Sequence, residues 1–363
     1  MKGVLTVENL SVQLTQNPKE KPAKGAKLGF GSVFTDHMLL MDYDKGIGWH
    51  DARIVPYGPI SISLAATCLH YAQETFEGMK AYRAEDGRVL LFRPEENFKR
   101  MNISNERMCI PQLDVDFCLN ALKKLVWLER DWIPEDKESS LYLRPMCIGV
   151  ESKLGVKDAD NYLFAILCSP SGPYYATGLK PVKIYVEEQY VRAVRGGVGF
   201  AKTGGNYACS MLAQSVAHEK GYAQVLWLDG VEKKYIGEVG AMNIFFVIDG
   251  EIVTPELDGS ILSGITRKSI IELLRHEGYR VTERKLSIQE VAESYRCGKL
   301  QEVFGSGTAA VISPVGELKW GDEVMIINNN EIGPISAHLY QELTDIQWGR
   351  VKGPEGWSVE VKE

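Results

Sequence analysis

Short apolar runs, each about as long as a strand, recur along the chain and are joined by tight turns. The segment KAYRAEDGRVLLF, residues 80–92, carries Asp86-Gly87 between two such runs, and FFVIDGEIVTPE, residues 245–256, carries Asp249-Gly250 in the same place. Asp-Gly pairs favour two-residue hairpin turns. The pattern therefore predicts sheets that are antiparallel or mixed.

Other segments place apolar residues three or four positions apart, as on one face of a helix. This spacing, together with glycines that close two of the segments, predicts four helices, at residues 61–73, 115–132, 210–221 and 266–278. Pro94 begins a further helix, which carries Arg100. Helices interspersed with hairpins indicate an α+β fold rather than a strict series of parallel βαβ units.

A chain of 363 residues is long enough for two domains. The segment SPSGPYYATGLKP, residues 169–181, holds three prolines and two glycines and follows the apolar run NYLFAILC. Such a segment is typical of a connection between domains. We predict an N-terminal domain at 1–170, an interdomain loop at 171–182 and a C-terminal domain at 183–363.

Composition narrows the class of protein. The net charge of −7 argues against partners such as nucleic acid or an anionic membrane, which select basic surfaces. The longest uncharged run, residues 54–73, contains Pro56 and Pro59 and does not fit a membrane span, and no secretory signal is recognised. The seven scattered cysteines form no CxxC pair, which favours reduced thiols in a cytoplasm and no metal site.

The segment GFAKTGGNY, residues 199–207, isolates one lysine, Lys202, among apolar residues and glycines. Its ordinary interpretation is a solvated turn lysine. A second interpretation is a phosphate-binding loop, because GGVGFAKT approximates G-x-x-x-x-G-K-[ST] and VLWLD, residues 225–229, could end in a magnesium ligand. Ala201 replaces the last glycine of that motif, and Gly204 and Gly205 are poor residues for the helix that should follow.

A third interpretation is a lysine that forms a Schiff base with pyridoxal 5′-phosphate (PLP), which also needs an acid at the ring nitrogen and donors for the phosphate. Glu238, in GEVGAMNIFFV, could supply the acid, or could be an exposed strand end. The amides of Ile265 and Thr266, in a Ser-Gly-Ile-Thr helix start, could bind phosphate, or the serine could simply cap the helix. The turn GSGT, residues 305–308, offers further donors, although an ordinary hairpin accounts for it as well.

Taken together, the chain resembles the branched-chain amino acid aminotransferases, which are fold type IV PLP enzymes. The resemblance covers nearly the whole sequence. It rests on ordered blocks: FGSVFTDHMLLMDY, LHYAQETFEGMKAYR, LFRPEENFKRM, LYLRPMCIGVESKLGV, GFAKTGGNYACS, GEVGAMNIFF, LSGITR and FGSGTAAVISPV.

The resemblance implies a role for each matching residue. Lys202 is the Schiff-base lysine and proton shuttle, Glu238 pairs with the ring nitrogen, and Tyr207 meets the phenolic oxygen of PLP. The phosphate is held by Arg100, Ile265, Thr266 and Thr308. The substrate is met by Phe30, Tyr71, Tyr142, Arg144, Val156, Tyr175, Thr308 and Ala309. Gly204 and Gly205 are expected to let the backbone pass close to PLP.

The implied reaction is reversible ping-pong transamination between leucine, isoleucine or valine and 2-oxoglutarate, in a homodimer whose partner subunit contributes Val156. Arg144 is expected to meet the second carboxylate of glutamate. Two positions depart from the mammalian members: Ala310 and Ser313 replace the cysteines of a redox switch, and Ala241 replaces a threonine. D-amino acid aminotransferases and aminodeoxychorismate lyases share the lysine and glutamate, and remain alternatives.

Overall fold

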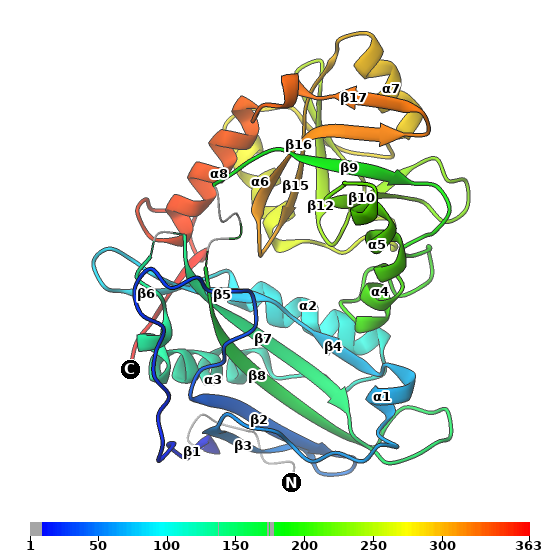
Figure 1. The fold of residues 1–363 in the computed structure, drawn as a ribbon. Helices are drawn as coiled ribbons and strands as arrows, with labels where there is room; N and C mark the ends of the chain where they lie inside the picture. The colour runs from blue at the N-terminus through cyan, green and yellow to red at the C-terminus, as the bar shows by residue number, and fades with distance from the viewer. Residues whose placement is uncertain (1–8, 137, 173, 175–177) are drawn as a thin grey trace. The chain divides into compact units, whose positions relative to one another are not determined.

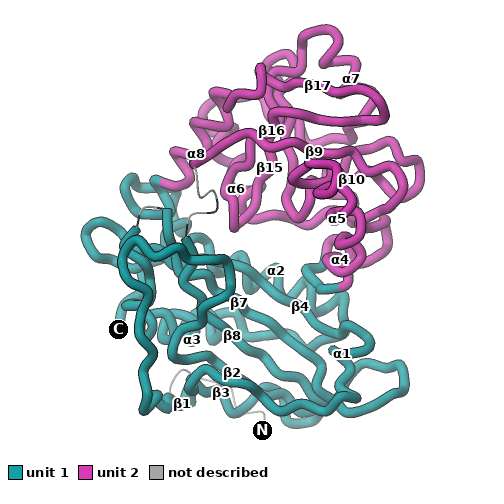
Figure 2. Tube along the Cα trace, in the orientation of Figure 1, with its two compact units in different colours: residues 1–176, 201–204, 345–363 teal, residues 177–200, 205–344 magenta. Residues whose placement is uncertain are grey.

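The computed structural model describes residues 9–136, 138–172, 174 and 178–363. The chain divides into two compact units, coloured separately in Figure 2. Unit 1 comprises residues 1–176, 201–204 and 345–363, and unit 2 comprises residues 177–200 and 205–344. Each unit is built around a sheet of its own.

The sheet of unit 1 is antiparallel in its described pairings, except that β1 runs parallel to β3. Its strand order is β1 (Ser11–Val12), β3 (Gly48–Pro56), β2 (His37–Asp44), β8 (Asn161–Ser171), β7 (Ser140–Gly149), β5 (Met79–Arg83), β6 (Val89–Phe92) and β18 (Ser358–Val361), with β4 (Glu74–Phe76) paired to β7. Helices α2 (Pro94–Arg107) and α3 (Val115–Leu128) share one apolar core with this sheet (Figure 1). This core follows from amphipathic helices burying their apolar stripe against alternate strand positions.

The sheet of unit 2 is mixed. Its order is β11 (Ile236–Val239), β10 (Gln224–Leu228), β9 (Val182–Glu187), β16 (Val311–Trp320), β15 (Leu300–Gly307), β12 (Asn243–Ile248), β13 (Glu251–Thr254) and β14 (Val281–Glu283), with β17 (Glu323–Ile326) paired to β16. Leu226 and Leu228 pack in the core that includes α7 (Ile288–Arg296), whereas Val225 and Trp227 pack with α5 (Met211–Glu219). Alternate side chains of β10 therefore serve opposite faces of the sheet.

The remaining helices range from 3₁₀ turns of three residues to α8, with 14 residues. They are α1 (Thr67–Tyr71), the 3₁₀ turn η2 (Arg130–Trp132), α4 (Gly204–Ala208), α6 (Ile265–His276), the 3₁₀ turn η3 (Asn328–Asn330) and α8 (Pro334–Gln347). No helix in the described part of the chain is long and apolar enough to cross a membrane.

Both predicted hairpins are confirmed. β5 pairs with β6 across Asp86-Gly87, and β12 pairs with β13 across Asp249-Gly250. In the second turn both residues have positive φ, 53° and 78°, a conformation that aspartate tolerates and glycine adopts without strain. The α+β fold class is likewise confirmed.

Three of the four periodic segments form helices close to the predicted bounds, and α2 begins at Pro94. The prediction for residues 61–73 was wrong in extent, because only Thr67–Tyr71 is helical. Leu64, at 91% exposure, and Leu69, at 54%, are not buried, so no core supports a longer helix here.

The division between units lies within the predicted loop at 171–182, but two segments differ from the predicted domains. Residues 201–204 and 345–363 group with unit 1, although sequence reasoning placed them in the C-terminal domain. Strand β18 pairs with β6, and hydrogen bonds from unit 1 hold residues 202 and 204. These tertiary contacts join segments distant in the sequence, which a composition boundary does not reveal.

Candidate active site

Lys202 lies in a four-residue segment of unit 1 whose backbone is held on both sides. Its N–H donates to Oγ of Ser104 at 2.8 Å, and its carbonyl accepts from the N–H of Phe76 at 3.0 Å. Its amine lies 4.8 Å from the centroid of the Phe76 ring. The side chain is partly buried and Ala201 before it is fully buried, so Lys202 is not an ordinary solvated turn lysine.

The segment is also held by a partly buried carboxylate, that of Glu74. The N–H of Gly204 and the hydroxyl of Thr203 both donate to Oε1 of Glu74, the latter at 3.3 Å. Burial raises the pKa of Glu74, and these donors and Arg144 offset part of that rise. A Cβ at residue 204 would lie 2.5 Å from Oε1, so a larger residue here would displace the Glu74 carboxylate. The expected close approach to PLP is not needed to account for Gly204.

An aromatic and cationic cluster adjoins the lysine. The guanidinium of Arg144 lies 4.7 Å from the Phe76 centroid and donates to the hydroxyl of Tyr142 at 2.9 Å. Phe30 packs edge-on against Tyr142, with ring centroids 4.6 Å apart. Nε of Arg144 is buried and has no hydrogen-bond partner among the described residues. Such a donor is costly to leave unsatisfied, so this cluster is suited to an anionic group.

Arg100, from α2, forms a buried ion pair with Glu77. Nε and Nη2 of Arg100 donate to the two carboxylate oxygens at 2.8 and 2.7 Å, and Asn97 donates to the same carboxylate at 2.8 Å. This bidentate arrangement fixes the plane of the guanidinium. The ion pair therefore holds Arg100 in one orientation within unit 1.

In unit 2, Glu238 on β11 is 3% exposed and ionically paired with Arg192. Nε of Arg192 lies 2.7 Å from Oε2 of Glu238, and Asn243 donates to Oε1 at 3.3 Å. An exposed strand end is therefore excluded. Sequence reasoning missed Arg192. A buried carboxylate needs a cationic partner, which could have suggested an arginine. Arg195 is only three positions away, however, and the sequence does not show which of the two arginines reaches Glu238.

The start of α6 and the turn between β15 and β16 present polar groups in unit 2. The N-cap residue of α6 is Gly264, so no N-cap side chain accepts from the first-turn amides of Ile265 and Thr266. The β15–β16 turn contains Thr308 and Ala309, and Val311 at its end has φ of 61°. A β-branched residue in this region is strained, as occurs at binding sites.

Tyr71 and Val156, both expected to line the substrate pocket, lie on an exposed surface. Tyr71, at the end of α1, donates to the carbonyl of Leu154, and Val156 is 85% exposed. Neither residue has a described contact with the Arg144 cluster. Tyr175 lies outside the described residues. Tyr207 is partly buried in α4.

Asp229, which the phosphate-loop interpretation needs as a magnesium ligand, has a structural role instead. Asp229 accepts from four backbone N–H groups of the turn that follows β10. Burial opposes its ionisation, but these donors lower its pKa to about 2, so it is a structural carboxylate. One sequence argument against this loop was wrong: a helix does begin at Gly204, as the five-residue α4.

The residues present fit PLP on two observations besides the lysine. Arg144 leaves Nε unsatisfied in unit 1, and Ser306 leaves a buried hydroxyl unsatisfied in unit 2, among the described residues. Ser306 pairs across strands with Asn243, whose amide reaches Glu238. Cross-strand partners project on the same face, so the unsatisfied hydroxyl lies beside the buried acid.

Comparison with known proteins agrees with this chemistry. The profile of the family "Amino-transferase class IV" matches residues 74–318. The chain is 56% identical over 357 residues, 98% of each chain, to "Branched-chain-amino-acid aminotransferase 2" of Bacillus subtilis. It is 59% identical over 353 residues to a "Probable branched-chain-amino-acid aminotransferase" of Staphylococcus aureus, covering 97% of this chain and 98% of that one.

Solved structures give the same result. The Escherichia coli branched-chain amino acid aminotransferase is 26% identical with a TM-score of 0.74, covering 90% of this chain and 99% of that one. The T.th. branched-chain amino acid aminotransferase complexed with N-(5′-phosphopyridoxyl)-L-glutamate is 28% identical with a TM-score of 0.73, covering 89% and 98%. The chain belongs to the class IV aminotransferase family, as one of its PLP-dependent branched-chain-amino-acid transaminases.

Proposed function

We propose that the protein catalyses reversible ping-pong transamination between leucine, isoleucine or valine and 2-oxoglutarate. One observation carries the proposal: the amine of Lys202 and the guanidinium of Arg144 both lie near the Phe76 ring centroid, at 4.8 and 4.7 Å. A nucleophilic amine and an anion-binding group thus share one aromatic platform. This pairing suits an amino acid substrate whose α-carbon must be deprotonated beside a bound carboxylate.

Lys202 is proposed to hold the cofactor covalently and to move the proton of the substrate α-carbon. When bound, PLP supplies an aldehyde that takes up the amino group and a ring that withdraws electrons from that carbon. The hydrogen bonds to Ser104 and Phe76 hold the backbone of the lysine, so the amine moves only through its side-chain torsions. Positioning of this kind raises the efficiency of proton transfer.

Glu238 is proposed to face the ring nitrogen of the cofactor in its ionised form. Arg192 supports that form, because a neighbouring guanidinium favours a carboxylate over a carboxylic acid. Arg100, the amides of Ile265 and Thr266, and Thr308 are proposed to hold the phosphate. Tyr207 would donate to the phenolic oxygen, and the Thr308–Ala309 turn would bind the α-carboxylate.

Replacement of Arg144 tests how one pocket accepts both leucine and glutamate. We expect Arg144→Met to lower kcat/KM for glutamate about 10- to 100-fold, the value of one charge-assisted hydrogen bond. Leucine should change less than about threefold, because it brings no second charge to the site. Half-reaction rates measured by stopped-flow absorption check this, with Tyr142→Phe as the control that keeps the guanidinium. Equal losses for both substrates would contradict the assignment.

A second copy of the chain is proposed to cover the surface around Leu154 and Val156. These side chains are 76% and 85% exposed, and Leu64 is 91% exposed. Their loops are joined by a hydrogen bond between the Ser63 and Ser152 hydroxyls at 2.9 Å. Large apolar side chains gathered on hydrogen-bonded loops are typical of an interface, and Val156 would complete the pocket of the partner subunit.

Substitution of this surface should separate the subunits. We expect Leu154→Asp with Val156→Asp to convert a dimer into monomers in sedimentation velocity and to reduce activity in parallel. A buried unpaired carboxylate at each position would cost several kcal/mol. Val231→Asp, at an 83% exposed site in unit 2, is the matched control. A dimer that survives both changes would exclude this surface.

An absorption titration tests the function as a whole. The visible band of the purified protein should fade with L-leucine and return with 2-oxoglutarate. D-Alanine in place of L-leucine should leave the band unchanged; the reverse result would favour a D-amino acid aminotransferase. Release of pyruvate and aminobenzoate from aminodeoxychorismate would favour the lyase. The reaction is proposed to take place in the cytoplasm, where all seven cysteines would remain reduced thiols.

A further inference from the structure

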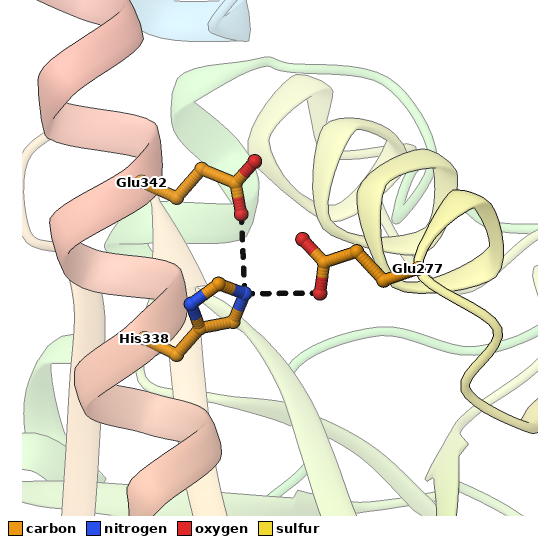
Figure 3. A group of neighbouring side chains, drawn as sticks. All are labelled: Glu277, His338 and Glu342. Atoms are coloured by element: carbon orange, nitrogen blue, oxygen red, sulfur yellow. Dashed lines mark hydrogen bonds and ion pairs between the residues drawn. The ribbon is translucent and has the colours of Figure 1, made fainter. Parts of the chain in front are cut away.

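Three metal-ligating side chains converge in unit 2, apart from every residue assigned above. Glu277 follows the last residue of α6, and His338 and Glu342 lie one turn apart on α8. Nε2 of His338 is 2.9 Å from Oε2 of Glu277 and 3.2 Å from Oε2 of Glu342. Figure 3 shows both carboxylates directed at the same ring nitrogen. All three ligand atoms lie within 4.8 Å of one another.

The imidazole cannot satisfy both carboxylates equally. Nε2 carries at most one hydrogen, and it makes a hydrogen bond with Glu277. Oε2 of Glu342 is buried at the atomic level and has no hydrogen-bond partner among the described residues, although the ring nitrogen lies 3.2 Å away. A buried carboxylate oxygen without a donor is unfavourable. The ring nitrogen therefore donates to Glu277 or to Glu342 but leaves the other carboxylate without a hydrogen bond from it.

The position of Glu277 at the end of a helix is a second unfavourable feature of this cluster. Glu277 stands at the C-terminal end of α6, where the helix dipole is negative and disfavours a carboxylate. Arg275 in the same turn does not offset it, because its guanidinium donates to Glu283 at 3.1 Å. A cation between the three side chains would offset the helix dipole at Glu277 and would also give Oε2 of Glu342 a partner.

We propose that Glu277, His338 and Glu342 bind a divalent cation of the first transition row, such as Mn²⁺ or Zn²⁺. Imidazole nitrogen with carboxylate oxygens is a ligand set that these ions accept, and three protein ligands leave positions for water. His338 and Glu342 are four residues apart, so they project from one face of α8. Binding replaces the proton on Nε2 and links the end of α6 to α8.

The test is a titration of the holoenzyme with Mn²⁺, followed by the loss of the electron paramagnetic resonance signal of the free ion. Mn²⁺ is chosen because the exposed thiols of Cys109, Cys209 and Cys297 bind soft ions such as Zn²⁺. We expect about one ion per chain in the wild type, displaced by Zn²⁺. The control, His276→Gln, removes an exposed histidine of α6 and should bind like the wild type.

The variants His338→Gln and Glu342→Gln should each weaken Mn²⁺ binding by at least about tenfold, since each removes one ligand bond. Mn²⁺ should also raise the melting temperature of the wild type but not of His338→Gln. Circular dichroism of each variant shows whether it is folded. Wild-type protein that binds no Mn²⁺ at about millimolar concentration, or folded His338→Gln that binds it unchanged, would overturn the proposal. Either readout is independent of transaminase activity.

Discussion

Replacement of Lys202 by alanine is expected to lower turnover of L-leucine by at least about 10⁴-fold, because one side chain supplies both the covalent link and the proton transfer. The backbone contacts of the segment, to Ser104 and Phe76, do not involve the lysine side chain. Folding should therefore survive the change, and purified variant should still bind PLP without a covalent bond. Steady-state assays with L-leucine and 2-oxoglutarate measure the loss.

Two further measurements connect the loss to the amine itself. Borohydride reduction of the wild type should attach the cofactor to the peptide that contains residue 202, and the variant should carry no label. Added methylamine should restore part of the variant's proton-transfer rate, since a free amine can replace the missing base. Label on another lysine, or near-normal turnover by Lys202→Ala, would refute the assignment.

Replacement of Arg192 by methionine is expected to damage both stability and catalysis. Arg192 and Glu238 form a buried pair with side-chain exposures of 8% and 4%, and removal of one partner of such a pair costs about 3–5 kcal/mol. Glu238 should then take up a proton and lose its ability to stabilise a charged ring nitrogen. We expect kcat to fall about 10²- to 10³-fold with little change in KM, as for loss of one preorganised electrostatic contact.

A double variant distinguishes the two effects. Arg192→Met with Glu238→Gln removes both charges, so chemical unfolding should show it to be more stable than Arg192→Met alone. Its activity should remain as low, because no carboxylate then faces the ring nitrogen. Arg192→Lys should recover stability in part. If the double variant regains activity along with stability, the ion pair serves only the fold.

Local sequence patterns were sufficient for much of the secondary structure. Asp-Gly turns, Pro94 and the apolar stripe of residues 115–128 act through contacts within a few residues, so their outcome does not depend on distant parts of the chain. For residues 61–73 the local pattern was not sufficient. Their apolar residues satisfy a helical pattern, but among the described residues no element buries Leu64 or Leu69, and only five residues are helical.

The reactive residue types could likewise be recognised in the sequence, because lysine, glutamate and glycine-rich turns occurred in ordered blocks. The side chains that pair with these residues could not be recognised in the sequence. Arg192 meets Glu238 across 46 positions of sequence, Glu74 fastens Gly204 across 130, and Glu277 meets His338 across 61. Ion pairs and hydrogen bonds depend on distance in space, which spacing along the chain does not encode.

The same reason explains why sequence reasoning, which considered only the cysteines, expected no metal site. Sequence spacing reveals ligands that lie on one helix or loop, as His338 and Glu342 do, but two ligands alone are a common surface pair. The third, Glu277, is brought to them by the packing of unit 2. The sequence thus specifies the chemical groups and the local elements of this transaminase, while tertiary packing selects which groups are buried, which are paired and which buried atoms lack a hydrogen-bond partner among the described residues.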